Sequence, residues 1–92
     1  MNFKEFIKYL KEKGLDPDFN DLSVIFYDSA IVFELYETRT ISIEYNGDVD
    51  DITVTGLEAS EGETISFSVI KDVYNVMQAI KDNHYMLNEF LK

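Results

Sequence analysis

The chain opens with a spacing of apolar residues that predicts an amphipathic helix. Apolar side chains recur at intervals of three and four residues, at Phe3, Phe6, Ile7 and Leu10. Lysines occupy much of the other side. Gly14 follows the stripe, and glycine is favoured just after a helix because it adopts left-handed backbone angles without strain. We therefore expect a helix that ends before Gly14.

Between residues 22 and 70 the spacing changes to alternation, which predicts strands with one buried and one solvent-facing side. Five short runs show it, around residues 24–26, 31–36, 41–45, 52–54 and 65–69. The connections are short, and Asn46-Gly47 predicts a hairpin because both residues tolerate positive φ. Short connections require antiparallel neighbours, since parallel strands need a long crossover. The sequence therefore predicts an antiparallel meander of four to five strands.

From Ile70 the apolar spacing returns to about 3.6 residues. One face carries Val73, Met77, Ile80, His84, Leu87 and Leu91. Asp82-Asn83 could cap a new helix, so this segment forms either one helix or a helix pair. The predicted fold class is α+β: an N-terminal helix, the meander, and a C-terminal helix or helix pair packed on one face of the sheet. Residues 1–92 are expected to form a single domain.

The composition supports one compact core. The chain has 92 residues, is 46% hydrophobic, and contains seven Phe and six Tyr. It has no cysteine, which excludes disulfides, thiolate metal sites and cysteine nucleophiles. The first eight residues do not resemble a secretory signal, and no run of 18 apolar residues occurs. We therefore expect a cytoplasmic protein with no membrane partner.

The negative charge is concentrated in the strand region. The net charge is −10. Residues 1–15 carry four lysines and two glutamates, and residues 71–92 carry three bases and three acids. Residues 16–70 carry thirteen acids against one base, Arg39. Such a chain is repelled by phosphate backbones and attracted by basic protein surfaces, so we expect a protein partner and no direct contact with nucleic acid.

The strand carboxylates could imitate a nucleic acid. Successive same-face carboxylates on a strand lie about 7 Å apart, and duplex DNA carries about one phosphate charge per 1.7 Å of its axis. Tyrosines on the same strands could act as anchors. The candidate partner-binding residues are Glu34, Tyr36, Glu37, Glu44, Tyr45, Asp48, Asp50, Asp51, Glu58, Glu61 and Glu63. The alternative interpretation is that the acidity serves only solubility.

Small size, acidity, absence of cysteine and this layout resemble small phage-encoded inhibitors of host defence, anti-CRISPR proteins in particular. The opening helix at residues 2–8 and the strand acids Glu34 and Glu44 are similar in style to some of them. The resemblance covers the general layout and includes no diagnostic motif. It implies a protein partner, often a nuclease whose nucleic-acid groove is blocked. It transfers no functional residue to this chain.

Catalytic, metal and cofactor sites are not predicted. Asp16, Asp18 and Asn20 match the first ligands of a calcium loop, but Asp21 stands where the turn glycine belongs. The acids near residues 48–51 could bind a hard cation, although acidic hairpin turns are common without metal. His84 is the only histidine, and we interpret it as a packed or capping residue. We expect a non-enzyme without cofactor.

A different function also fits the sequence. Tyr85, Met86, Phe90 and Leu91 supply more apolar surface than one helix face needs. The alternative function is a small structural or assembly module of a phage or bacterial complex, which docks or self-associates through this helix or through an exposed strand edge. The sequence leaves open whether the chain is a monomer or a homodimer.

Overall fold

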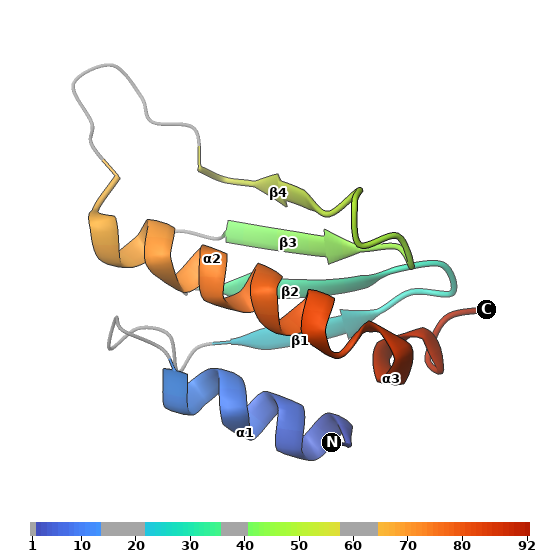
Figure 1. Ribbon diagram of the computed structural model, residues 1–92. Coiled ribbons are helices and arrows are strands. Elements are labelled where there is room, and N and C mark those ends of the chain that lie inside the picture. Colours follow the sequence, from blue (N-terminus) through green and yellow to red (C-terminus); the bar gives the residue numbers. More distant parts are fainter. Residues whose placement is uncertain (1, 14–21, 36–40, 58–64) are drawn as a thin grey trace.

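The computed structural model describes residues 2–13, 22–35, 41–57 and 65–92, and it has the predicted α+β architecture (Figure 1). One helix precedes a four-stranded antiparallel meander of strand order β1-β2-β3-β4, and two helices follow it. The elements are α1 (Phe3–Lys13), β1 (Ser23–Phe26), β2 (Ile31–Leu35), β3 (Ile41–Tyr45), β4 (Thr53–Thr55), α2 (Phe67–Asp82) and α3 (His84–Asn88).

The strand register places one row of apolar side chains across the sheet. Val24 on β1 is paired with Phe33 on β2, which is paired with Ile43 on β3, which is paired with Val54 on β4. Helices α1 and α2 lie on this side of the sheet (Figure 1). The helices add Phe6, Leu10, Val76 and Ile80 to the core, all of them fully or almost fully buried. The other face of the sheet has no helix over it in the described part of the chain.

The fifth alternating run, residues 65–69, is not a strand, so its assignment as a possible fifth strand is wrong. Helix α2 begins at Phe67, and Ser66 caps its start: the Ser66 hydroxyl accepts a hydrogen bond from the Val69 backbone N–H at 3.4 Å. A serine N-cap favours helix initiation. Ile65 and Val69 are both half-buried, but Phe67 between them is 76% exposed, which does not fit the alternation of a strand.

The C-terminal segment forms a helix pair, with the break at Asn83. The Asn83 side-chain amide donates to the Ala79 carbonyl at 2.9 Å, which satisfies a carbonyl at the end of α2. His84 Nδ1 lies 2.9 Å from the Lys81 carbonyl oxygen, and its ring centroid is 4.0 Å from that of Tyr85. His84 therefore has the structural role that its isolation in the sequence predicts.

Three phenylalanine rings join the two ends of the chain to the sheet. The Phe3 ring centroid lies 5.2 Å from that of Phe26 and 5.3 Å from that of Phe90, and the Phe26 and Phe90 centroids are 5.5 Å apart. In addition, the Lys92 backbone N–H donates to the Asp28 carbonyl at 2.7 Å. These contacts hold α1, the end of β1 and the C-terminal residues together.

Candidate protein-binding surface

The open face of the sheet carries two of the predicted carboxylates. Glu34 on β2 is paired with Ser42 on β3, two residues before Glu44. The two glutamates are therefore diagonal neighbours on one face, with Cβ atoms about 7–8 Å apart. Glu44 is exposed and Glu34 is half-buried. The register places small polar or aliphatic side chains around them: Ser23, Ile25, Val32, Ser42, Thr53 and Thr55.

The connection between β3 and β4 presents three exposed aspartates in an ordered turn. The Asn46 side-chain oxygen accepts from the Asp48 N–H at 3.1 Å, and Asp48 Oδ1 accepts from the Asp50 N–H at 2.9 Å. The Asp51 N–H donates to the Asp48 carbonyl at 3.1 Å, and Asp51 Oδ2 accepts from the Asn46 amide at 3.3 Å. Such side-chain-to-backbone bonds are typical of Asx turns. Asp48 and Asp51 therefore help to hold the loop, whereas the Asp50 side chain points to solvent.

Two further residues shape and anchor this loop. Gly47 has φ +103°, a backbone angle that glycine adopts without strain and that other residues rarely take. A Cβ at this position would come within 3.4 Å of Leu91 Cδ1. Val49 is half-buried and packs against the core cluster. The predicted Asn46-Gly47 hairpin is thus present, with a longer connection than a two-residue turn.

The loop lies beside the open-face glutamate at one end of the sheet. Ile31, where β2 begins, is paired with Tyr45, where β3 ends, so the β1–β2 turn and the β3–β4 loop lie at the same end (Figure 1). We call Glu44, Asp48, Asp50 and Asp51 the acidic end. All four side chains are exposed.

Lysines do not neutralise the acidic end within the described ranges. The ion pair found nearby joins Lys92 Nζ to Asp28 Oδ1 at 3.6 Å, and both side chains are exposed. An exposed pair of this kind contributes less than about 1 kcal/mol. In the same ranges, no lysine lies within 4.0 Å of the carboxylates of Glu34 or the acidic end. Among the described residues, the acidic end therefore has no lysine counter-ion.

Tyr45 is not part of this surface, and its predicted role as an anchor is wrong. Its side chain is fully buried on the helix side of the sheet, and its hydroxyl donates to Asn88 Oδ1 at 2.6 Å. Burial raises the pKa of the phenol above its ordinary value; the bond to Asn88 acts in the opposite direction, and the charge of Asp48 adds to the increase. Alternation with Glu44 already placed Tyr45 on the opposite face from the glutamate.

Several other predicted positions fall outside the described residues. These are the candidate partner-binding residues Tyr36, Glu37, Glu58, Glu61 and Glu63, and the calcium-loop candidates Asp16, Asp18 and Asn20. Their roles stay predictions. Among the residues that are described, no group of three carboxylate or imidazole side chains is arranged to hold a metal ion.

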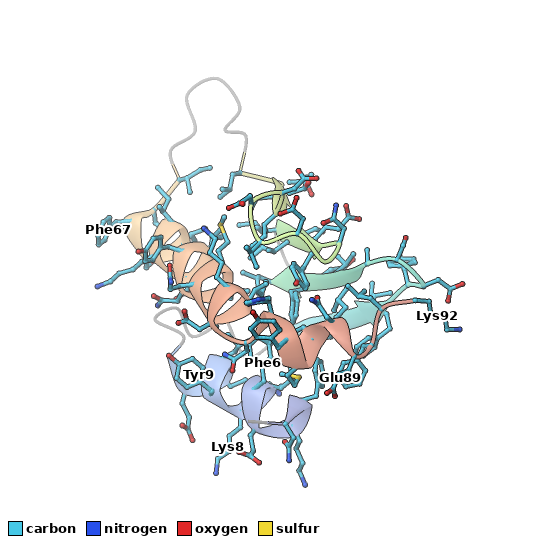
Figure 2. All side chains as sticks on the ribbon, turned by 45° about the vertical axis from the view of Figure 1, so that its right-hand side comes forward. Phe6, Lys8, Tyr9, Phe67, Glu89 and Lys92 are labelled. Atoms are coloured by element: carbon cyan, nitrogen blue, oxygen red, sulfur yellow. The ribbon has the colours of Figure 1, made fainter. Side chains whose placement is uncertain are left out.

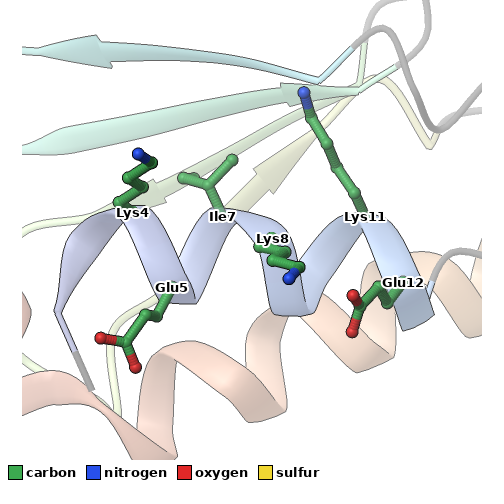
Figure 3. A pocket seen from close by; sticks show the side chains of 6 residues that line it. All are labelled: Lys4, Glu5, Ile7, Lys8, Lys11 and Glu12. Carbon is green, nitrogen blue, oxygen red and sulfur yellow. The ribbon is translucent and has the colours of Figure 1, made fainter.

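Lys4, Lys8 and Lys11 of α1 line a separate, shallow hollow of about 510 Å³ (Figure 3). Lys4, Ile7 and Lys11 project from one side of the helix, and Glu5 and Glu12 from another. The hollow carries three lysines and two glutamates, so, unlike the acidic end, it mixes both signs of charge.

The sequence interpretation missed an exposed apolar stripe on α2. Phe67, Ile70 and Tyr74 are 76%, 50% and 63% exposed. Their spacing of three and four residues is that of one helix face. The assignment of residues 65–69 to a strand concealed it.

No helix in the described ranges is both long and apolar enough to cross a bilayer. The chain matches no protein-family model, and no curated protein or solved structure matches it.

Proposed function

We propose that this chain is an acidic protein-binding inhibitor that occludes the basic nucleic-acid-binding surface of a host-defence nuclease, as a nucleic-acid mimic of the anti-CRISPR type. The observation that carries the proposal is the acidic end: four exposed carboxylates at one end of the sheet, with no described lysine within ion-pair distance. Glu34 extends this charge along the open face.

The electrostatics of the acidic end suit a basic partner. A cluster of like charges at a protein surface creates a field that steers an oppositely charged partner toward it and speeds association. The same field repels phosphates, so it favours a protein that binds nucleic acid over the nucleic acid itself.

The order of the loop also supports binding by this end. Three hydrogen bonds from backbone N–H groups and one between side chains order residues 46–51, and Val49 packs against the core cluster. A loop that is already ordered loses less conformational entropy on binding. The aspartates are thus presented in one arrangement, as phosphates are along a duplex.

The test compares two variants that change the net charge equally at different places. Glu44→Gln/Asp50→Asn neutralises two acids that hold no hydrogen bond of the loop by their side chains. Glu5→Gln/Glu12→Gln neutralises two acids of α1 (Figure 3). Tagged wild-type chain, incubated with host lysate at low salt, is expected to retain a nucleic-acid-binding protein that is released as salt rises.

The two variants are then expected to differ in how strongly they bind the captured protein. The Glu44→Gln/Asp50→Asn variant is expected to weaken binding of that protein by about tenfold, and the α1 variant by much less. An oligonucleotide substrate of the captured protein should compete with the wild-type chain. Equal binding by both variants, or simultaneous binding of the chain and the oligonucleotide, would contradict the proposal.

A further inference from the structure

The outward face of α2 is apolar where a surface helix normally carries charge. The helix packs on the core through Val73, Val76 and Ile80, and Phe67, Ile70 and Tyr74 occupy the opposite side. Figure 2 shows Phe67 projecting away from the body at one end of the helix. Exposed patches of this kind mark interaction sites more often than isolated exposed side chains do.

A groove adjoins this stripe between α1 and α2. It has a volume of about 170 Å³ and is lined by Tyr9 on α1 and by Tyr74, Asn75, Gln78, Ala79 and Asp82 on α2. Small-molecule sites usually have volumes of about 300–1,000 Å³, so the groove suits an inserted side chain better than a free ligand. Tyr74 belongs to both the stripe and the groove.

The projecting side chain and the groove have a spacing that suits a second copy of the same chain. In a two-fold interface, if residue i of one copy contacts residue j of the other, then j of the first contacts i of the second. Two α2 helices that run antiparallel and cross near Ile70 would place each Phe67 over the other copy's Tyr74, at the mouth of its groove. The two residues are seven positions apart, or about 10.5 Å along the helix. This register also superimposes the two apolar stripes.

The distribution of charge also favours a second copy of the chain as the partner. Helix α2 exposes Lys71, Lys81 and Asp82, whereas Asp72 is fully buried, so the exposed side of the helix carries only one net charge. The acidic end lies at the far end of the sheet from the start of α2 (Figure 1), so pairing through α2 keeps the carboxylates of two copies apart. Lys71 Nζ lies 5.8 Å from the Phe67 ring centroid, within the range of a cation–π contact.

From these features we propose that the chain forms a two-fold homodimer through antiparallel packing of α2, with Phe67 of each copy inserted beside Tyr74 of the other. Three apolar side chains and the groove rim bury less than the roughly 800 Å² per partner of a standard interface. The dimer is therefore weak, with a dissociation constant on the order of 10–100 µM. It leaves both acidic ends free, and it does not depend on the function proposed for them.

Sedimentation equilibrium of the intact chain between 10 µM and 1 mM tests this inference. The wild-type mass should rise toward that of a dimer, and it should do so at 500 mM NaCl as well, because apolar contacts are not screened. Phe67→Glu should remain a monomer throughout with an unchanged Tm, since Phe67 is exposed in the single chain. Tyr85→Ser is the matched control: Tyr85 is 81% exposed but lies outside the pairing, so dimerisation should persist.

A second measurement checks the register. The chain has no cysteine, so Ile70→Cys introduces a single thiol. A disulfide requires Cα atoms within about 7 Å, which the crossing near Ile70 provides. Ile70→Cys should cross-link in a glutathione buffer at a several-fold higher yield than Tyr85→Cys. A wild-type monomer at 1 mM, a dimer that survives Phe67→Glu, loss of the dimer in Tyr85→Ser, or equal cross-linking of the two cysteine variants would overturn the proposal.

Discussion

The acidic end and the outward face of α2 lie at different places on one small fold and differ in almost every property that governs association. The acidic end consists of carboxylates on a strand and in a loop, and hydrogen bonds from the same residues order that loop. The α2 face consists of two aromatic rings and an isoleucine on a helix without net charge. Salt weakens contacts made by the first surface and leaves those made by the second largely unchanged. A single core thus presents two chemically distinct surfaces that respond differently to the solvent.

The largest expected effect comes from a substitution in the hydrophobic core, on which both surfaces depend. Phe33 is fully buried at the centre of the core row, and its ring centroid is 5.9 Å from that of Phe6. Phe33→Ala should lower the free energy of unfolding by about 3–5 kcal/mol, through lost burial and the cavity left behind. Urea denaturation followed by circular dichroism measures this. A loss below about 1 kcal/mol would mean that the sheet does not pack on the helices as described.

Gly47→Ala should act on the acidic end alone. The positive φ of Gly47 opposes a side chain, whereas a Cβ at this position would make only an ordinary contact with Leu91. We expect a loss of about 1–2 kcal/mol in the free energy of unfolding, with amide NMR shifts confined to the loop and the residues around Leu91. A variant as stable as wild type would show that the loop does not need this backbone angle. Self-association through α2 should be unaffected.

Tyr45 connects the end of β3 to α3 through its hydroxyl, and Tyr45→Phe tests this connection. The variant loses the hydrogen bond to Asn88, at an expected cost of about 0.5–1.5 kcal/mol at pH 7. The raised pKa of Tyr45 adds a pH dependence. Above pH 10 or so, the unfolded chain loses this proton before the folded chain does, so the free energy of unfolding falls as pH rises. Below that pH the contribution is fully present.

Comparison of the two chains between pH 9 and pH 11 isolates this contribution. The decline in stability should be shallower in Tyr45→Phe than in wild type, and absorbance titration of wild type should show a late-ionising phenol that is absent from Tyr45→Phe. Identical pH dependence of stability in the two chains would mean that the Tyr45 hydroxyl is exposed to water, which would contradict its burial.

The smallest effect should come from removing one charge of the acidic end. Asp50 lies near other carboxylates and its side chain holds no hydrogen bond within the loop. Asp50→Asn should therefore raise the free energy of unfolding by a few tenths of a kcal/mol at low salt, and the gain should vanish in 500 mM NaCl. Glu12→Gln, the matched change on α1, should give no such gain. A loss of stability in Asp50→Asn would indicate a role in folding.

The sequence predicted the architecture because its two periods are clear. Alternation at Ile31, Phe33 and Leu35 and at Ile41, Ile43 and Tyr45 matches the buried faces of β2 and β3. It failed at residues 65–69, because a five-residue run is compatible with both periods and only the Ser66 cap decides between them. Periodicity shows which residues share a face of an element but not how far a helix extends.

The candidate surface was predictable in part for a related reason. Strand parity places Glu34 and Glu44 on one face, and turn-forming residues place the three aspartates in a loop. The grouping of Glu44 with that loop depends on strand register, which short runs do not specify alone. Tyr45 was misassigned because tyrosine suits both interfaces and cores, and its partner Asn88 lies 43 residues away.

The most direct test of the central claim is to locate by NMR where a basic probe binds. Titration of the labelled chain with a short polyarginine peptide at 20 mM salt should shift the amides of Glu44, Asp48, Asp50 and Asp51 together, with those of α1 and α2 nearly unchanged, and the shifts should collapse at 300 mM salt. Shifts spread evenly over the molecule, or an acidic end that does not respond, would contradict the account.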